Sequence, residues 1–259
     1  MPRLARITVY PIKSLPGVML ETVRVLASGA LADDRRWALV DDHDQVVTAK
    51  RCVAIHRLDA RFQLTASVVE LCDRERGEWQ TFSLQTDRAA LLEFVGSVLS
   101  QHVRLIENPE RGWPDDLDSP GPTIVATASL QAVADWFPGL NVDQVRGRFR
   151  ANLEIDGDEP FWEDRLIGPT GVVTPFHIGP VMLLGVNPCQ RCAVPTRDPM
   201  TGAVTPSFAK LFSAQREATL GAQVPRERFD HYYRLSVNTR LPPERMGGTI
   251  RVGDEVQLG

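Results

Sequence analysis

The chain has 259 residues, a formal net charge of −4, 43% hydrophobic residues and 24% charged residues. This length fits one large or two small domains whose core needs no disulfide framework, and the slight acidity argues against nucleic acid as a general partner. The N-terminus has no uninterrupted apolar segment, and no stretch approaches the ~20 apolar residues of a membrane span. We therefore expect a cytoplasmic protein without a membrane partner.

The first hundred residues predict a β-rich region. Short runs rich in β-branched and aromatic residues alternate with turn-forming stretches such as 27–34 and 41–45, which is typical of short strands. One helix is expected over 87–101, because its apolar residues fall on one stripe and Asp87 stands at a capping position. The predicted strands are residues 6–11, 21–26, 36–41, 45–49, 61–66, 68–73 and 81–85.

Residues 107–122 are the best candidate for a domain boundary. This stretch is rich in proline, glycine and acidic residues, which are typical of a loop. It is either a linker or a loop that lines a site between two lobes.

The second half predicts more strands with short helices between them. Helices are expected over 129–137, capped by Ser129, and over 206–218, capped by Ser207. Residues 249–258 alternate apolar and polar side chains, as a half-buried hairpin or barrel strand does. The pattern indicates an α+β fold that is mostly β and has β-barrel character. The other predicted strands are residues 123–127, 151–156, 171–179 and 181–186.

Cys189 and Cys192 follow the predicted strand at 181–186 on a loop. A structural zinc site is disfavoured, because the other two cysteines and the five histidines are not spaced to complete four ligands. A thioredoxin-like redox pair is disfavoured too, because the prolines that follow prevent a helix. The adjacent Arg191 and the polar loop favour an accessible, thiolate-prone sulfur at Cys192, while Cys189 is more easily explained as a packed thiol.

The stretch PCQRCAVPTRDPMTG (188–202) resembles the C-x-R-C…D-P-x-T-G motif of the MOSC family, named after the C-terminal domain of molybdenum-cofactor sulfurases. Earlier segments, YPIKSLPG, DRRW and VVTAK, resemble the N-terminal β-barrel domain that precedes MOSC in many members. TASL, RFRANLEI, FWEDRLIG and GTIRVGDEV follow in the family's order. The resemblance implies an N-terminal MOSC β-barrel domain over 1–106, a connecting or site loop over 107–122 and a MOSC domain over 123–259.

In layout the chain is most similar to the amidoxime reducing component branch. This resemblance implies a molybdopterin-type molybdenum cofactor and reduction of small N-hydroxylated or other N-oxygenated compounds. Cys192 takes the position of the catalytic cysteine and metal ligand, and soft thiolate suits such a metal. The resemblance implies cofactor contacts, or candidates for them, at Lys13, Ser14, Arg35, Ser119, Arg150, Asn152, Gln190 and Arg191.

Two further features of the resemblance concern partners and alternatives. No iron–sulfur domain is recognisable in the sequence, so we expect electrons from a separate ferredoxin-like or flavin-reductase-like protein. An alternative role is sulfur transfer, in which Cys192 carries a persulfide for cofactor or metal-cluster maturation, and another is a cofactor carrier without chemistry. The cations Lys13, Arg35 and Arg150 favour the role of a reductase or of a cofactor carrier, because a persulfide carrier needs no cationic site for a phosphate.

Overall fold

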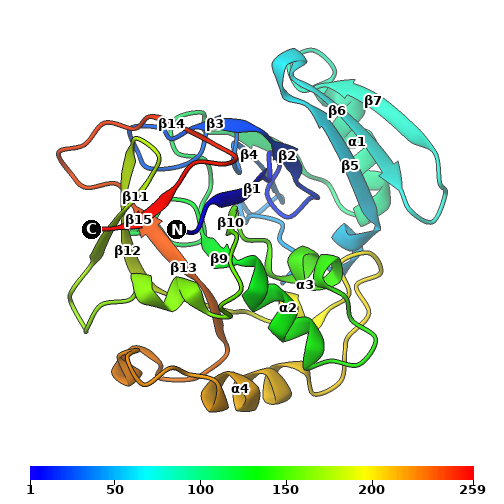
Figure 1. Cartoon of the computed structure of the whole chain (residues 1–259). Helices are drawn as coiled ribbons and strands as arrows, with labels where there is room; N and C mark the ends of the chain where they lie inside the picture. Colours follow the sequence, from blue (N-terminus) through cyan, green and yellow to red (C-terminus); the bar gives the residue numbers. More distant parts are fainter.

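The computed structural model describes residues 1–259, and its largest element is an eight-stranded sheet (Figure 1). Neighbouring strands are antiparallel, except that β9 and β10 are parallel. From one edge to the other the order is β15 (Val256–Leu258), β11 (Thr174–Ile178), β12 (Val181–Gln190), β13 (Arg234–Arg240), β9 (Ile124–Ala126), β10 (Leu153–Ile155), β1 (Leu4–Val9) and β2 (Val18–Leu20).

This sheet brings the two ends of the chain together. The Val256 amide donates to the Pro2 carbonyl at 2.9 Å, and the termini lie side by side. A second contact is the two-stranded sheet of β3 (Thr22–Arg24) and β14 (Thr249–Arg251). The N-terminal strands therefore share a sheet and a hydrophobic core with the strand that carries Cys189.

A separate hydrophobic core lies in the N-terminal half. It is covered by α1 (Arg88–Leu99), by the sheet of β5 (Leu58–Gln63), β6 (Val68–Asp73) and β7 (Trp79–Ser83), and by the pair β4 (Trp37–Val40) and β8 (Arg104–Glu107). Along β5, Leu58, Ala60 and Phe62 are buried while Arg61 and Gln63 are exposed, because successive side chains of a strand point to opposite faces. In Figure 1 this sheet and α1 form one side of the molecule.

A third core is aromatic and lies under α2 (Thr127–Asp135), α3 (Val142–Phe149) and α4 (Phe208–Ala218). The rings of Phe137 and Phe208 stack with centroids 4.3 Å apart. Helix α3 begins with a capping box in which the side chains of Asn141 and Gln144 each bond the other's backbone N–H. Such a box satisfies two donors at the helix start and makes a short helix stable. None of the helices combines the length and the apolar character that crossing a bilayer requires.

The predicted fold class, α+β and mostly β, is confirmed, but one predicted strand is absent and one of the two alternatives for residues 249–258 is wrong. Residues 45–49 form no strand, and only Val46 makes an isolated bridge, to Val40. Residues 249–258 form two strands, but β14 pairs with β3 and β15 pairs with β11, so they are not a hairpin. Alternation indicates a half-buried strand and does not identify its partner. The domain division stays a prediction.

The helix starts also differ from the predictions. Helix α2 begins at Thr127, so Ser129 is a buried residue inside it and no cap. Asp87 and Ser207 occupy the N-cap positions of α1 and α4, but neither side chain bonds the helix. Helix α3 was not predicted, because its eight residues include a glycine and three charged side chains and show little apolar pattern.

Candidate functional site

A cavity of about 1590 Å³ is lined by residues from β1, α3, the 107–122 stretch and the loop after β12. Thirteen arginine and lysine side chains and seven carboxylates line it, in a chain whose net charge is −4. This excess of positive charge favours an anionic ligand. Eight of the nine predicted site residues line it: Lys13, Ser14, Arg35, Ser119, Arg150, Gln190, Arg191 and Cys192.

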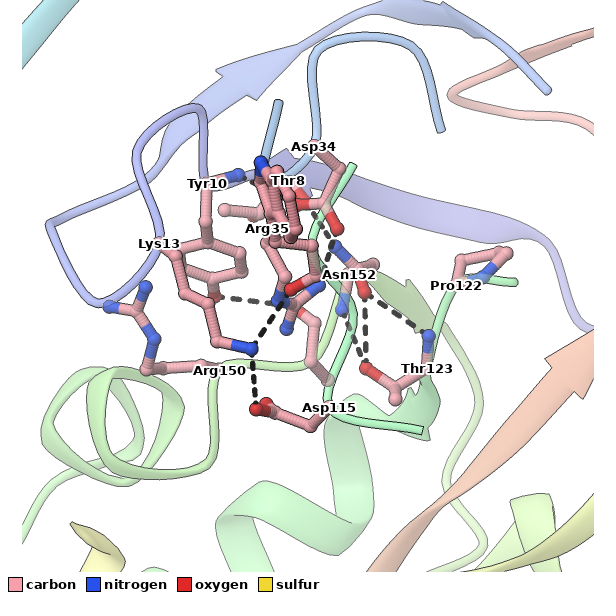
Figure 2. Close-up of polar contacts among 12 residues, drawn as sticks. Thr8, Tyr10, Lys13, Asp34, Arg35, Asp115, Pro122, Thr123, Arg150 and Asn152 are labelled. Atoms are coloured by element: carbon pink, nitrogen blue, oxygen red, sulfur yellow. Dashed lines mark hydrogen bonds and ion pairs between the residues drawn. The ribbon is translucent and has the colours of Figure 1, made fainter. Parts of the chain in front are cut away.

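Lys13 lies in the turn that follows β1. Its backbone N–H donates to the Trp37 carbonyl at 2.8 Å, which anchors the turn on β4. Its ammonium group donates to the Trp113 carbonyl at 2.9 Å and pairs with the Asp115 carboxylate at 2.7 Å (Figure 2). Seven residues of the 107–122 stretch line the cavity, and its role as a boundary between domains stays a prediction.

Arg35 is held against β1 by the backbone. Its N–H donates to the Tyr10 carbonyl at 2.9 Å, while the Asp34 carboxylate accepts from the Tyr10 N–H at 2.8 Å and pairs with the Arg35 guanidinium. Burial by itself would lower the pKa of Arg35, but Asp34 raises it above the usual value. The neighbouring Arg36 pairs with Asp33 and Glu107 instead and does not line the cavity.

Arg150 directly follows α3. Its guanidinium lies 4.0 Å from the Tyr10 ring centroid and donates to the Leu15 carbonyl at 2.6 Å. No carboxylate lies within ion-pair distance, and burial lowers the pKa of Arg150. Lys13, Arg35 and Arg150 therefore form a cation cluster around Tyr10 (Figure 2), with one cation that no carboxylate balances.

Three of the residues that line the cavity have a positive φ angle. Ser14, Arg35 and Arg150 all have positive φ angles, of 74°, 49° and 52°. Non-glycine residues seldom adopt such angles, and they concentrate at functional sites. The hydroxyl of Ser119 adds a further polar group, since it is buried and bonded to no protein atom.

Asn152 is the one predicted contact outside the cavity lining. It is 1% exposed, its amide nitrogen donates to the Thr8 carbonyl at 3.1 Å, and its oxygen accepts from the Thr123 N–H at 3.2 Å (Figure 2). Its side chain thus joins β1 to the segment that leads into β9.

Residues 189–205, which comprise the last two residues of β12 and the loop that follows them, are called the cysteine loop. Strand β12 continues to Gln190 through two register shifts, so Cys189 lies within the strand and not on a loop as predicted. Cys192 follows it, is exposed, and its sulfur accepts from the Val194 N–H at 3.5 Å. No group of three or more His, Cys, Asp or Glu side chains is placed to hold a metal. A metal at Cys192 would therefore take its other ligands from a bound group.

Tyr10, Asp34 and Asp115 complete the cation cluster and were not predicted. Tyr10 and Asp34 stand within the segments YPIKSLPG and DRRW, and the Tyr10 ring centroid lies 5.7 Å from the Arg35 guanidinium and 4.0 Å from that of Arg150. Asp115 belongs to a stretch whose spacing carried no signal, because its role depends on contact with Lys13, about a hundred residues away.

The cavity fits a ligand with an anionic end and a thiophilic metal. Cations line it, the Ser119 hydroxyl is buried without a hydrogen-bond partner, and the exposed Cys192 thiol lines the same cavity. Thiolate is a soft ligand that suits such a metal, and cations with backbone N–H groups suit a phosphate.

The sequence is similar to those of two groups of known proteins. The chain is 26% identical over 235 residues to molybdenum cofactor sulfurase of Drosophila mojavensis (79% of this chain, 29% of the relative), and 25% identical over 291 residues to that of Drosophila grimshawi (99% and 34%). It is 22% identical over 241 residues to human mitochondrial amidoxime reducing component 2 (78% and 68%). The chain thus spans about a third of the length of these sulfurases.

Two family descriptions match along the chain. Residues 1–104 match the MOSC N-terminal beta barrel domain. Residues 123–257, more than half of the chain, match the MOSC domain. The protein therefore belongs to the MOSC family, with the N-terminal beta barrel domain preceding the MOSC domain.

Proposed function

We propose that this chain binds a molybdopterin-type molybdenum cofactor and reduces small N-hydroxylated or other N-oxygenated compounds. The observation that carries the proposal is one cavity with the Cys192 thiol and the cation cluster on its wall. The relatives named amidoxime reducing component support the same activity.

In this proposal the chain supplies both ends of the cofactor site. Lys13, Arg35 and Arg150 hold the cofactor phosphate, and Cys192 is the metal ligand. The Ser119 hydroxyl, which has no hydrogen-bond partner in the protein, is a donor for the cofactor's polar edge. When bound, the cofactor would supply two-electron chemistry at its metal.

The reaction needs electrons that the substrate does not provide. Reduction of R–NHOH to R–NH₂ and water breaks the N–O bond and consumes two electrons and two protons. We propose that the electrons come from a separate ferredoxin-like or flavin-reductase-like protein.

A second candidate function is sulfur transfer by a persulfide on Cys192. It is favoured by the exposure of this thiol and by the two relatives named molybdenum cofactor sulfurase. It leaves the cation cluster without a role unless the cofactor itself is the sulfur acceptor.

The decisive test compares the parent protein with Cys192→Ser and the matched Cys189→Ser. The proteins are made in a host with intact molybdenum-cofactor synthesis, and bound molybdenum and benzamidoxime reduction with an artificial electron donor are measured. We expect the parent to contain molybdenum and to be active, and Cys192→Ser to show only background activity. Cys189→Ser should lose at most ~10–100-fold of the activity, because in this proposal the Cys189 sulfur does not bind the metal but lies next to the residues that do.

Three outcomes contradict the proposal. Equal losses in both variants would indicate a cysteine pair that acts as a unit. A parent that contains molybdenum but reduces no N-oxygenated compound would exclude the reductase. Cyanide-labile sulfur on Cys192 in such a parent would support the second candidate.

A further inference from the structure

Arg191 connects the cysteine loop to two other elements. Its guanidinium donates to the Leu235 carbonyl at 2.7 and 3.0 Å, to the Phe149 carbonyl at 3.1 Å, and to the Ser236 hydroxyl. Leu235 and Ser236 lie in β13, and Phe149 is the last residue of α3. The residue next to Cys192 is therefore bonded to the residue next to Arg150.

Arg148 makes a second connection, which runs from α3 to the cysteine loop. It lies in α3, is 4% exposed, and its guanidinium donates to the Pro195 carbonyl at 2.9 Å and to the Thr205 hydroxyl at 3.0 Å. Both acceptors belong to the cysteine loop, on either side of its tip. Together, Arg148 and Arg191 are called the arginine clasp below.

Helix α3 and the cysteine loop also pack closely at Gly147 and Pro199. A Cβ atom at Gly147 would lie 3.1 Å from Cγ of Pro199, so α3 and the loop are in close contact and a side chain at this position would press on Pro199. Residues 147–149 of α3 thus contact the cysteine loop, and the next residue, Arg150, belongs to the cation cluster.

We propose that Arg148 and Arg191 are positioning residues that hold the Cys192 sulfur at a set distance from the Arg150 guanidinium. The inference rests on the proposed function, in which these two groups bind opposite ends of one ligand. The protein acceptors already engage the Arg191 Nε and both of its terminal nitrogens, and both terminal nitrogens of Arg148. A planar guanidinium reaches several acceptors in fixed directions, which an ammonium group does not.

The test uses Arg191→Lys and Arg148→Lys, which keep the positive charge but lack the planar guanidinium that donates to several acceptors at once. Arg165→Lys is the matched control, because Arg165 is partly exposed and pairs with Glu159. Hydrogen exchange of residues 189–205 is measured in protein without cofactor, and turnover per bound molybdenum in loaded protein. We expect at least about tenfold faster exchange and a ~10–100-fold lower turnover per molybdenum, with unchanged values in the control.

Gly147→Ala provides an independent variant, because it displaces Pro199 without removing a charge. It should raise hydrogen exchange in the same loop, and it provides the measurement if Arg148→Lys prevents folding. Unchanged exchange in the Arg191→Lys and Gly147→Ala proteins would overturn the proposal. So would a loss of molybdenum with constant turnover per molybdenum, since that indicates direct cofactor contact.

Failure of the proposed function is distinguishable from failure of the clasp. If the parent reduces no N-oxygenated compound, the exchange measurement still applies, and so does the rate at which iodoacetamide alkylates Cys192 in a Cys189→Ser background. A faster rate in the clasp variants supports the positioning role, and an unchanged rate contradicts it.

Discussion

The cation cluster of the cavity and a second buried charge cluster differ in what balances their charge. The second cluster consists of Glu163, Asp164 and Arg216, which are 1%, 6% and 1% exposed and do not line the large cavity. It has two carboxylates for one cation, whereas the cation cluster has three cations for two carboxylates. Each cluster therefore has one unbalanced charge, of opposite sign.

In this second cluster, called the closed cluster because it does not line the cavity, we expect a proton on Glu163 to offset the excess negative charge. Arg216 donates to both oxygens of Asp164 at 2.6 Å. Glu163 accepts from the Ser129 hydroxyl at 2.7 Å with one oxygen, while its other oxygen is buried without a partner. Burial and the adjacent Asp164 raise the pKa of Glu163 to about 7. The cation cluster lines a cavity, so an anionic ligand can offset its excess positive charge, as a proton on Glu163 offsets the excess negative charge of the closed cluster.

The largest expected effect comes from Glu163→Gln. A carboxyl whose pKa rises from 4.5 to about 7 on folding contributes stability that is present below pH 4.5 and is lost as the pH rises through 7. The loss amounts to about 3 kcal/mol. The free energy of unfolding, measured by urea denaturation from pH 4.5 to 8, should therefore fall less steeply in the variant than in the parent.

Glu159→Gln is the control for this measurement, because Glu159 is half-exposed and pairs only with Arg165. Its pH profile should follow that of the parent. Parallel profiles for the parent and Glu163→Gln would show that no proton balances the closed cluster, and the comparison would fail.

A smaller effect is expected from Arg150→Ala, which removes the cation that no carboxylate balances. Loss of one charge-assisted contact of about 1.5–3 kcal/mol should reduce cofactor retention by roughly 10–150-fold. Bound molybdenum after dialysis is the measurement, Arg165→Ala is the surface control, and Arg150→Lys should restore part of the loss. Full molybdenum occupancy in Arg150→Ala would exclude a role for the unbalanced charge.

Local pattern predicted much of the fold, because strands and long helices depend on nearby residues. The strands β1, β5 and β6 were expected from runs of β-branched and aromatic residues between turn-forming stretches, and the helix α1 from apolar spacing. The pairing of β14 with β3, more than two hundred residues away, has no local signal. Ser129 was mistaken for a cap because its real partner, Glu163, is distant in sequence.

The candidate site divides in the same way. The cysteine loop is one continuous segment, so its composition already indicated an accessible thiol at Cys192. The cation cluster joins residues near positions 13, 35, 115 and 150, and only a family resemblance brought three of them together. Asp115 and the clasp role of Arg148 depend on contacts that no spacing rule describes.

The smallest expected effect is that of Asp115→Asn, which sharpens the comparison by adding to the excess positive charge. Asp115 pairs with Lys13 at 2.7 Å, but its side chain is 79% exposed, so solvent screens the pair. Cofactor retention should rise by less than about fivefold, and the gain should shrink at high salt because the Debye length falls. Asp118→Asn, in the same loop and without an ion pair, is the control. Weaker cofactor retention in Asp115→Asn would mean that the carboxylate matters mainly because it holds the Lys13 side chain in place. The excess positive charge would then not explain why the cavity binds an anionic ligand.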